Sequence, residues 1–238
     1  MQGKSRIGKR TWVAGILLAV GVPLLLAVSF WAFQDRNYYF ISVCMILLAM
    51  LPFFFVFEGR KPQAREIRVI AVRKALAVIG RSAFFMIPQV KPMAAIVIIA
   101  GIVLGAEAGF LTGALAAFVS YFMFGQGPWT PWQMFAFGVL GFLAGILFYR
   151  KHGEELESRF AVCLYGGLST LLLYGIIMDA STFLMYSSEL TAGGLIATCV
   201  SGFPYNLVHA ASTIVFLWVL YRPMAEKLQR VRMKYGMS

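Results

Sequence analysis

The stretch FGQGPWTPWQMF, residues 124–135, decides how this sequence divides into helices. It lies within a run from residue 108 to residue 149 in which no side chain is charged. Two glycines, two prolines, two tryptophans, a threonine and two glutamines fall inside it. Glycine and proline interrupt helices, whereas indole rings favour the boundary between lipid and water. The stretch therefore predicts a turn between two membrane spans, with polar groups that can hold a ligand.

The composition is that of a polytopic membrane protein. Of 238 residues, 60% are hydrophobic and 13% are charged, and the mean hydropathy is +0.78. A soluble domain carries about twice that charged fraction. The formal net charge of +11 does not indicate nucleic-acid binding, because the basic residues lie at the ends of apolar runs, next to anionic lipid headgroups. Cys44, Cys163 and Cys199 have apolar neighbours and no paired spacing, which predicts buried thiols rather than a zinc or disulfide framework.

Apolar runs of about 20 residues can cross the hydrocarbon core, and the sequence predicts an all-α protein with eight of them. The spans are expected at residues 12–33, 38–57, 67–86, 93–106, 107–124, 131–149, 160–178 and 204–221. The first is too long for a signal peptide and is expected to be retained. A turn of small residues, 105–109, is expected between the fourth and fifth spans. Residues 179–203 are expected to form short helices at the membrane interface.

The lysines and arginines predict the orientation of these spans. Of 21 such residues, only Arg36, Arg81 and Lys91 fall on the side opposite the termini. By the positive-inside rule both termini are cytoplasmic, and the loop 87–91, the stretch 124–135 and the segment 179–203 face outward. A basic linker around Pro62 predicts three parts: a two-span extension (1–62), a six-helix membrane core (63–222) and a basic cytoplasmic tail (223–238).

Ionisable side chains within apolar spans point to an outward-facing site. Arg81 is expected in the outer leaflet, where it either snorkels to the interface or pairs with an anion or with an acid such as Asp179. His209 is the only titratable group inside the last span. Asn206 precedes it by three residues and so shares its helical face, and Tyr205 is expected to start that helix. His209 is either a packing residue or a ligand contact.

The turn at residues 124–135 offers a second set of candidate groups. Trp129 and Trp132 either anchor the turn at the interface or form a surface on which a ring stacks. The neighbouring Gln126, Thr130 and Gln133 supply hydrogen-bonding groups. Glycines recur at helical spacing before and after the turn, at 109 and 113 and at 138, 141 and 145, which predicts close helix packing there. Glu107 is expected to complement the dipole of the helix that it begins.

Motifs for catalysis are absent from the sequence. No phosphate-binding GxxxxGK[ST] loop, H-E-x-x-H or G-x-S-x-G is present, and no cluster of metal ligands occurs. We therefore predict no catalytic residues, no bound metal and no cofactor.

From about residue 65 to residue 221 the chain resembles the substrate-binding S component of an energy-coupling factor (ECF) vitamin transporter. The residues that carry the resemblance are AVRKALAVIGR (71–81), Pro92, GIVLGAEAGFLTGALAAFVS (101–120), GQGPWTPWQM (125–134), GVLGFLAGIL (138–147) and FPYNLVHAAS (203–212). Spans one and two lie outside it. Within the family, the GPWTPWQM sequence is most similar to members for cobalamin or related corrinoids.

The resemblance implies a prokaryotic plasma-membrane protein that captures a vitamin-like ligand outside the cell. Ala71 and Ala75 match the family's alanine motif and would pack against a transmembrane coupling subunit, while two ABC-type ATPases on separate chains would drive import. The ligand would lie in a pocket formed by the three outer segments. Its candidate contacts are Arg81, Gln89, Lys91, Gln126, Trp129, Thr130, Trp132, Gln133, Asp179, Tyr205, Asn206 and His209.

Two other functions remain open at the level of sequence. One is a scaffold subunit whose polar outer loops bind a partner protein. The other is an intramembrane enzyme that uses His209 and Asp179 on a lipid-like substrate, although these residues lie 30 apart with no supporting motif.

Overall fold

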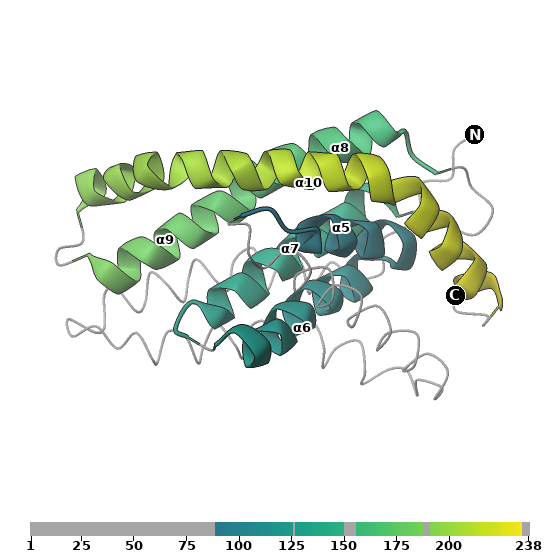
Figure 1. Cartoon of the computed structure of the whole chain (residues 1–238), viewed down its shortest axis with the longest axis horizontal. Coiled ribbons are helices and arrows are strands. Elements are labelled where there is room, and N and C mark those ends of the chain that lie inside the picture. Colours follow the sequence, from purple (N-terminus) through teal and green to yellow (C-terminus); the bar gives the residue numbers. More distant parts are fainter. Residues whose placement is uncertain (1–88, 126, 150–155, 188–190, 235–238) are drawn as a thin grey trace.

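The computed structural model describes residues 89–125, 127–149, 156–187 and 191–234, and all regular structure within them is helical (Figure 1). The expected spans at 12–33, 38–57 and 67–86, and the expected boundary near Pro62, lie outside the described residues. The helices are α5 (Met93–Leu104), α6 (Ala106–Phe124), α7 (Thr130–Phe148), α8 (Arg159–Leu168), the π-helix η2 (Ser169–Tyr174), α9 (Gly175–Tyr186) and α10 (Ala192–Lys234).

Helices α5 and α6 form a tight antiparallel pair joined by a single residue, Gly105. Its φ of 98° lies in a region that side-chain-bearing residues rarely adopt. The turn is thus shorter than the expected 105–109, because α6 already begins at Ala106. Glu107 lies in the first turn of α6, where a carboxylate complements the helix dipole.

Glycines bring α5, α6 and α7 into backbone contact, which confirms the close packing predicted from their spacing. A Cβ atom added at Gly101 or at Gly109 would collide with the carbonyl group of Gly141, and one at Gly113 would collide with that of Phe137. Small residues at such crossings allow close backbone approach, which strengthens helix association in a membrane.

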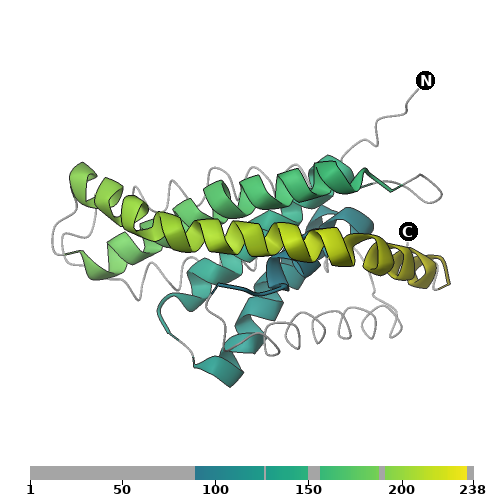
Figure 2. The ribbon, with the colours of Figure 1, turned by 45° about the horizontal axis from the view of Figure 1, so that its top comes forward.

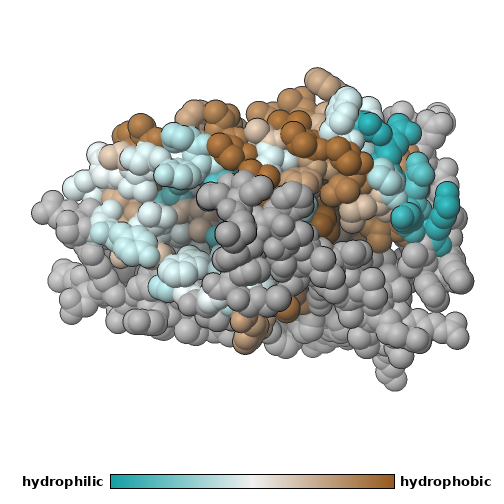
Figure 3. All heavy atoms as spheres, viewed as in Figure 1, coloured by the Kyte–Doolittle hydropathy of each residue, from teal (hydrophilic) through white to brown (hydrophobic). Residues whose placement is uncertain are grey.

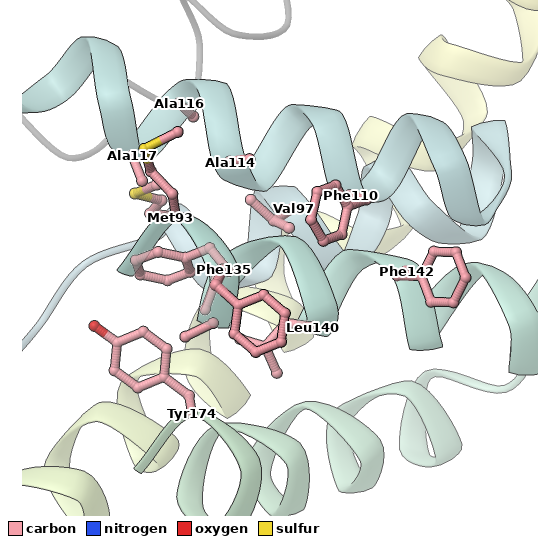
Figure 4. Close-up of a cluster of buried hydrophobic side chains, with 14 of the residues drawn as sticks. Met93, Val97, Phe110, Ala114, Ala116, Ala117, Phe135, Leu140, Phe142 and Tyr174 are labelled. Atoms are coloured by element: carbon pink, nitrogen blue, oxygen red, sulfur yellow. The ribbon is translucent and has the colours of Figure 1, made fainter. Parts of the chain in front are cut away.

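A hydrophobic cluster fills the space beside this glycine contact (Figure 4). Met93 and Val97 come from α5, Phe110 from α6, and Phe142 and the fully buried Leu140 from α7. The Phe110 and Phe142 rings meet edge to face, with centroids 6.4 Å apart. The cluster reaches the second half of the molecule through Tyr174 of η2, so the two halves share one core.

The second half is a pair of long antiparallel helices, which lie side by side in Figures 1 and 2. α8, η2 and α9 form one continuous helix, Arg159–Tyr186, of 28 residues. It begins at a cap in which the Ser158 hydroxyl accepts a hydrogen bond from the Ala161 backbone N–H at 3.2 Å. α10 follows with 43 residues. The C-terminal end of α9 and the N-terminal end of α10 lie at the left of both figures. There the two helices extend farther than the turn between α6 and α7.

The expectation of short interfacial helices across residues 179–203 is wrong. α9 continues to Tyr186 and α10 begins at Ala192, so the segment consists mainly of the ends of two long helices. The hydroxyl groups that made it look polar donate to carbonyl groups of their own helix: Ser181 and Thr182 to Met178 at 2.8 and 2.9 Å, and Thr198 to Gly194 at 2.9 Å. Hydroxyls paired in this way are compatible with a helix in lipid.

The expected last span, 204–221, is too short at both ends. Proline favours the first turn of a helix, but Pro204 and Pro223 both lie inside α10. Tyr205 accordingly lies within the helix rather than at its beginning. The boundary set between residues 222 and 223 falls inside α10 as well, so the first part of the basic tail continues the last span.

Surface composition supports a membrane location for this half. In the part of the chain that the structure describes, three helices are long and apolar enough to cross a membrane: Thr130–Phe148, Arg159–Tyr186 and Ala192–Arg230. Met93–Leu104 and the apolar part of α6, Ala106–Phe122, are shorter. Exposed apolar side chains recur at every fourth position along α8, η2 and α9, namely at Phe160, Leu164, Leu168, Leu172 and Ile176. Such a stripe is typical of a surface that faces lipid.

One end of the molecule is basic, and we call it the basic end. Figure 3 shows hydrophobic side chains across the middle of the visible face and hydrophilic ones at the right, where α10 ends. Arg222, Lys227 and Arg230 are exposed there. Arg159, at the start of α8, lies 5.3 Å above the Trp218 ring of α10. The turn between α6 and α7 and the loop between α9 and α10 lie at the opposite end.

Candidate functional site

Polar side chains meet along the interface between η2–α9 and α10, and we call this set the polar seam. Asn206 Nδ2 donates a hydrogen bond to Asp179 Oδ2 at 2.9 Å. Farther from the α9–α10 loop, the rings of Tyr174 and His209 lie 4.7 Å apart in an edge-to-face arrangement. Farther still, Thr170 Oγ1 donates to Thr213 Oγ1 at 3.4 Å. The seam consists of Thr170, Tyr174, Asp179, Asn206, His209 and Thr213.

Helical spacing and two glycines produce the seam. Asn206, His209 and Thr213 follow one another at intervals of three and four residues, so they share one face of α10. A Cβ atom added at Gly175 would lie 2.9 Å from the Asn206 side chain, and one at Gly202 would collide with the Asp179 carboxylate. The absence of side chains at these two positions therefore leaves room for the carboxylate and amide between the helices.

The carboxylate–amide pair lies in the half of the two long helices that is farther from the basic end. Asp179 precedes the last residue of α9, Tyr186, by seven positions, or about 10 Å of helix. His209 lies thirteen positions, or about 20 Å, before Arg222 at the basic end. Since the hydrocarbon core is about 30 Å thick, these spacings put the pair nearer to the opposite face of a membrane that the helices span.

His209 connects three helices. Only 3% of its surface is exposed, and its ring centroid lies 6.2 Å from that of Phe137 on α7 as well as 4.7 Å from Tyr174. The Phe137 and Tyr174 rings lie 4.7 Å apart. In Figure 4 the Tyr174 ring rises from its own helix toward Phe135 of α7. These contacts hold the imidazole ring in one orientation. Its nitrogen atoms therefore point in defined directions toward any polar group that they bind.

Tyr174 and Thr170 belong to the π-helix η2, which lies in the middle of the long helix. A π-helical turn inserts one extra residue per turn into a helix, and it occurs frequently at functional sites. Both side chains are buried, at 6% and 0% exposure, and both meet α10. The π-helix thus directs two polar side chains of one helix toward the seam.

Asp179 is an ionisable residue within a predicted membrane span. Burying a charge there costs free energy, and ionisable residues in such positions have a functional role in most cases. Its carboxylate accepts the Asn206 hydrogen bond and forms no ion pair with any residue in the described part of the chain. The side chain is half-buried. An ionised carboxylate accepts several hydrogen bonds and donates none, so the group that completes its environment has to be a donor.

The turn before α7 uses two of the predicted contacts for its own structure. The Thr130 hydroxyl accepts a hydrogen bond from the Gly127 backbone N–H at 3.1 Å, and the Thr130 N–H donates to the Gly127 carbonyl oxygen at 2.9 Å. The Trp129 indole lies directly against Gly127, so that a Cβ atom at this glycine would meet the ring. Trp129 is half-buried, which leaves part of its surface for a ligand or for lipid.

Trp132 lies in the core, with 2% of its surface exposed. Its indole Nε1–H is buried and has no hydrogen-bond partner in the structure as described. A buried donor without an acceptor is rare in native proteins and calls for an explanation, of which a ligand acceptor is one. Gln133, the next residue, is half-buried.

The remaining predicted contacts are dispersed. Gln89 and Lys91 are half-buried in the segment that enters α5 from the left in Figures 1 and 2, and Gln89 has a φ of 60°. Tyr205 is 62% exposed on α10. The candidate ligand contacts Arg81 and Gln126, and the predicted partner-binding residues Ala71 and Ala75, lie outside the described residues.

Sequence reasoning missed part of the seam: Thr170, Tyr174 and Thr213, together with Phe137. A usable signal was present, because Thr170 and Tyr174 are four residues apart in an otherwise apolar run, and His209 and Thr213 are too. The π-helix carries no sequence signature of comparable strength. Within the described ranges, no group of three His, Cys, Asp or Glu side chains could hold a metal ion.

Comparison with known proteins gives one family. Residues 61–226 match the family described as "ECF-type riboflavin transporter, S component". The comparisons with curated proteins and with solved structures gave no match. The matched residues make up more than half of the chain and include every helix of the fold described above except the last residues of α10. The chain therefore belongs to the family of S components, the substrate-binding membrane subunits of ECF transporters.

Proposed function

We propose that this protein captures riboflavin at the outer face of the membrane for import by an ECF transporter. The observation that carries the proposal is the polar seam: a buried imidazole and a carboxylate–amide pair lie together within membrane spans, in the half opposite the basic end. By the positive-inside rule that half is the outer one. The family description supplies the name of the ligand.

The chemistry of riboflavin suits these groups. Its ribityl chain carries hydroxyl groups, which donate hydrogen bonds to a carboxylate such as Asp179 and accept them from an amide such as Asn206. The edge of its planar ring system offers both donors and acceptors, which His209 and the Trp132 indole N–H can match. Sites of this kind combine apolar enclosure with a small number of placed polar groups.

The resemblance to cobalamin and corrinoid members, stated from the sequence, receives no support from the family match. A corrinoid is several times larger than a flavin, whereas the seam is closely packed against α7 by the ring contacts of Phe137, Tyr174 and His209. We therefore favour the smaller ligand.

The proposal is tested by titrating the purified protein into riboflavin and following the quenching of flavin fluorescence. Wild-type protein is expected to bind, and His209→Phe is expected to bind about tenfold or more weakly, because the ring contacts survive while the nitrogen atoms are lost. The control, Val215→Ala, lies on the exposed face of the same helix and should leave the affinity unchanged. Absence of riboflavin binding by the wild type would refute the proposal.

The same purified protein also distinguishes riboflavin capture from the two rival functions, a scaffold subunit and an intramembrane enzyme. Mass spectrometry of small molecules that co-purify with the protein should detect a flavin if the proposal holds. The contacts of the two residues do not favour the enzyme hypothesis, because Asp179 accepts a hydrogen bond from Asn206 and His209 packs against the Tyr174 and Phe137 rings. A scaffold subunit would carry no flavin.

A further inference from the structure

We infer that the last turns of α10, residues 222–234, form a binding surface for anionic phospholipid headgroups of the cytoplasmic leaflet. This surface lies at the basic end, away from the polar seam, so the inference goes beyond riboflavin capture and does not rest on it. It is carried by the length of α10, by the bend at Pro223 and by the separation of apolar and cationic side chains around the helix.

Trp218 marks the depth at which α10 leaves the hydrocarbon. Val215, Trp218 and Val219 are exposed, and the next exposed residue along the helix is Arg222. Arg159 of the neighbouring α8 lies 5.3 Å above the Trp218 ring. A tryptophan in such surroundings is typical of the boundary between hydrocarbon and headgroups. The exposed surface of α10 therefore changes from apolar to cationic within about one turn, at headgroup depth.

α10 is much too long to end at this boundary. It continues past Trp218 to Lys234, which adds about 24 Å of helix. On one side of a bilayer the headgroup layer is only about 5–8 Å thick. A straight helix would place Lys227 and Arg230 about 14 and 18 Å beyond Trp218, so their backbone would lie in water rather than among the headgroups.

Pro223 bends the helix directly after the boundary. Proline has no N–H group to pair with the carbonyl oxygen four residues earlier, and its ring clashes with that carbonyl group, so that it kinks a helix. Figure 1 shows the turns after Pro223 leaving the axis of the span and running downward at the right. The bend therefore lets the later cations stay closer to the depth of Arg222 than a straight helix would.

The bent segment has an apolar face and a cationic face. Tyr221 and Ala225 are fully buried, and Met224 and Leu228 pack against the same cluster of α5 and α8 side chains. This inner face fixes the segment to the protein. The exposed side chains lie on the opposite face, which we call the cationic face, and they are Arg222, Glu226, Lys227 and Arg230.

The charge of the segment favours an anionic occupant. Residues 222–234 contain five lysines and arginines and a single acid, Glu226. Basic clusters next to the cytoplasmic end of a span attract anionic lipids, and guanidinium groups pair well with phosphate oxygens. The cationic face also follows directly on the exposed Val215 and Val219. This continuity favours the headgroups of the same lipids whose chains cover those two residues.

The test measures which lipids the full-length protein retains from nanodiscs that contain equal amounts of phosphatidylglycerol and phosphatidylcholine, counted by native mass spectrometry. Wild-type protein is expected to retain phosphatidylglycerol at least about tenfold in preference to phosphatidylcholine. Lys227→Gln combined with Arg230→Gln should abolish most of this preference, because each cation near the surface contributes about fivefold.

Two matched variants change the same face in other ways. Lys227→Arg combined with Arg230→Lys exchanges the side chains but keeps both charges, and it should behave as wild type. Glu226→Gln removes the acid of this face and should raise the preference for phosphatidylglycerol. All three positions are exposed, so unfolding temperatures in detergent should match that of the wild type and show that the variants are folded.

The outcomes decide the inference independently of the proposed function. Equal retention of the two lipids by the wild type would overturn it. A preference that survives the loss of both cations would also overturn it, and would leave an acidic protein surface as the occupant of the cationic face. If the exchange variant loses the preference as well, charge is not its cause. Riboflavin binding should be the same in all four proteins, so neither failure carries over to the other proposal.

Discussion

Asn206 is one of the residues that connect the two long helices of the site through a polar contact. Its amide donates to Asp179 on α9, and its side chain lies against Gly175 of the same helix. Three residues later on α10, His209 packs against Tyr174 and Phe137. The ligand candidates of α10 therefore also hold helices together, so binding and stability have to be measured separately in any variant of this face.

The two tryptophans of the turn before α7 provide a test at the residue scale. Trp132→Ala should lower the free energy of unfolding by about 3–5 kcal/mol, because a fully buried indole leaves a large cavity in the core. Trp129→Ala should lower it by about 1 kcal/mol, since this side chain is only half-buried and rests on Gly127. Thermal unfolding in detergent measures both. Equal losses for the two variants would contradict the assignment of Trp132 to the core.

At the scale of the elements, two kinds of helix contact build the described part of the molecule. α5, α6 and α7 meet backbone to backbone at Gly101, Gly109 and Gly141. η2–α9 and α10 meet through the polar seam and through the glycines at 175 and 202. Without a hydrophobic force between helices in lipid, close packing and interhelical hydrogen bonds are the contacts that stabilise such an arrangement.

Gly141 offers a sharp test of the backbone contact. Gly141→Val should destabilise the protein by about 1–3 kcal/mol or more, because the new side chain would collide with the backbone of Gly109 and with the Val97 side chain. The matched control is Gly193→Ala in the first turn of α10, where an added Cβ atom meets nothing within 4 Å. That variant should be neutral or more stable, since alanine favours a helix. Similar unfolding temperatures for the two variants would refute the role of the contact.

At the scale of the whole molecule, membership in the S-component family makes this chain a substrate-binding subunit of a transporter and not an enzyme. The family also implies association with a coupling subunit and with ATPases. The exposed apolar stripe of α8, η2 and α9 and the basic end of α10 agree with a multi-pass membrane protein.

The predicted coupling face is tested by enlarging its small residues. Replacing Ala71 and Ala75 with Trp should prevent co-purification with the coupling subunit, because bulky side chains stop another helix from approaching. Ala211→Trp, at an exposed position of α10, is the matched control and should leave assembly intact. Riboflavin binding by the Ala71 and Ala75 variant shows that it is folded. Normal assembly of that variant would mean that the alanines lie elsewhere.

The orientation is tested by cysteine labelling in a background without the native cysteines. Thr191→Cys, just before α10, should react with a membrane-impermeant maleimide on intact cells, because the charge distribution predicts that this position lies outside. Lys227→Cys, at the basic end, should react only after the cells are opened. The reverse pattern would invert the topology and exclude the proposed outward site.

The part of the fold from α5 to α7 could be predicted from the sequence, because its signals come from residues that are neighbours in the chain. The expected spans 93–106, 107–124 and 131–149 match α5, α6 and α7 within two residues at each end. Glycine and proline at the breaks, unbroken apolar runs between them and glycines at helical spacing are all properties of neighbouring residues. The same kind of signal identified His209 and Asn206 as one helical face.

The α9–α10 half was decided only by tertiary structure. Whether Ser181, Thr182 and Thr198 interrupt a helix or pair with its carbonyl groups, and whether Pro204 begins a helix or lies within one, depends on the neighbouring helix, which is not encoded in a local pattern. The sequence by itself determined a helical membrane protein and named Asp179, Asn206 and His209 one by one. Only the packing of the two long helices brings them into a single seam with Tyr174 of the π-helix, because the side chains that pair there lie 27 or more positions apart in the sequence.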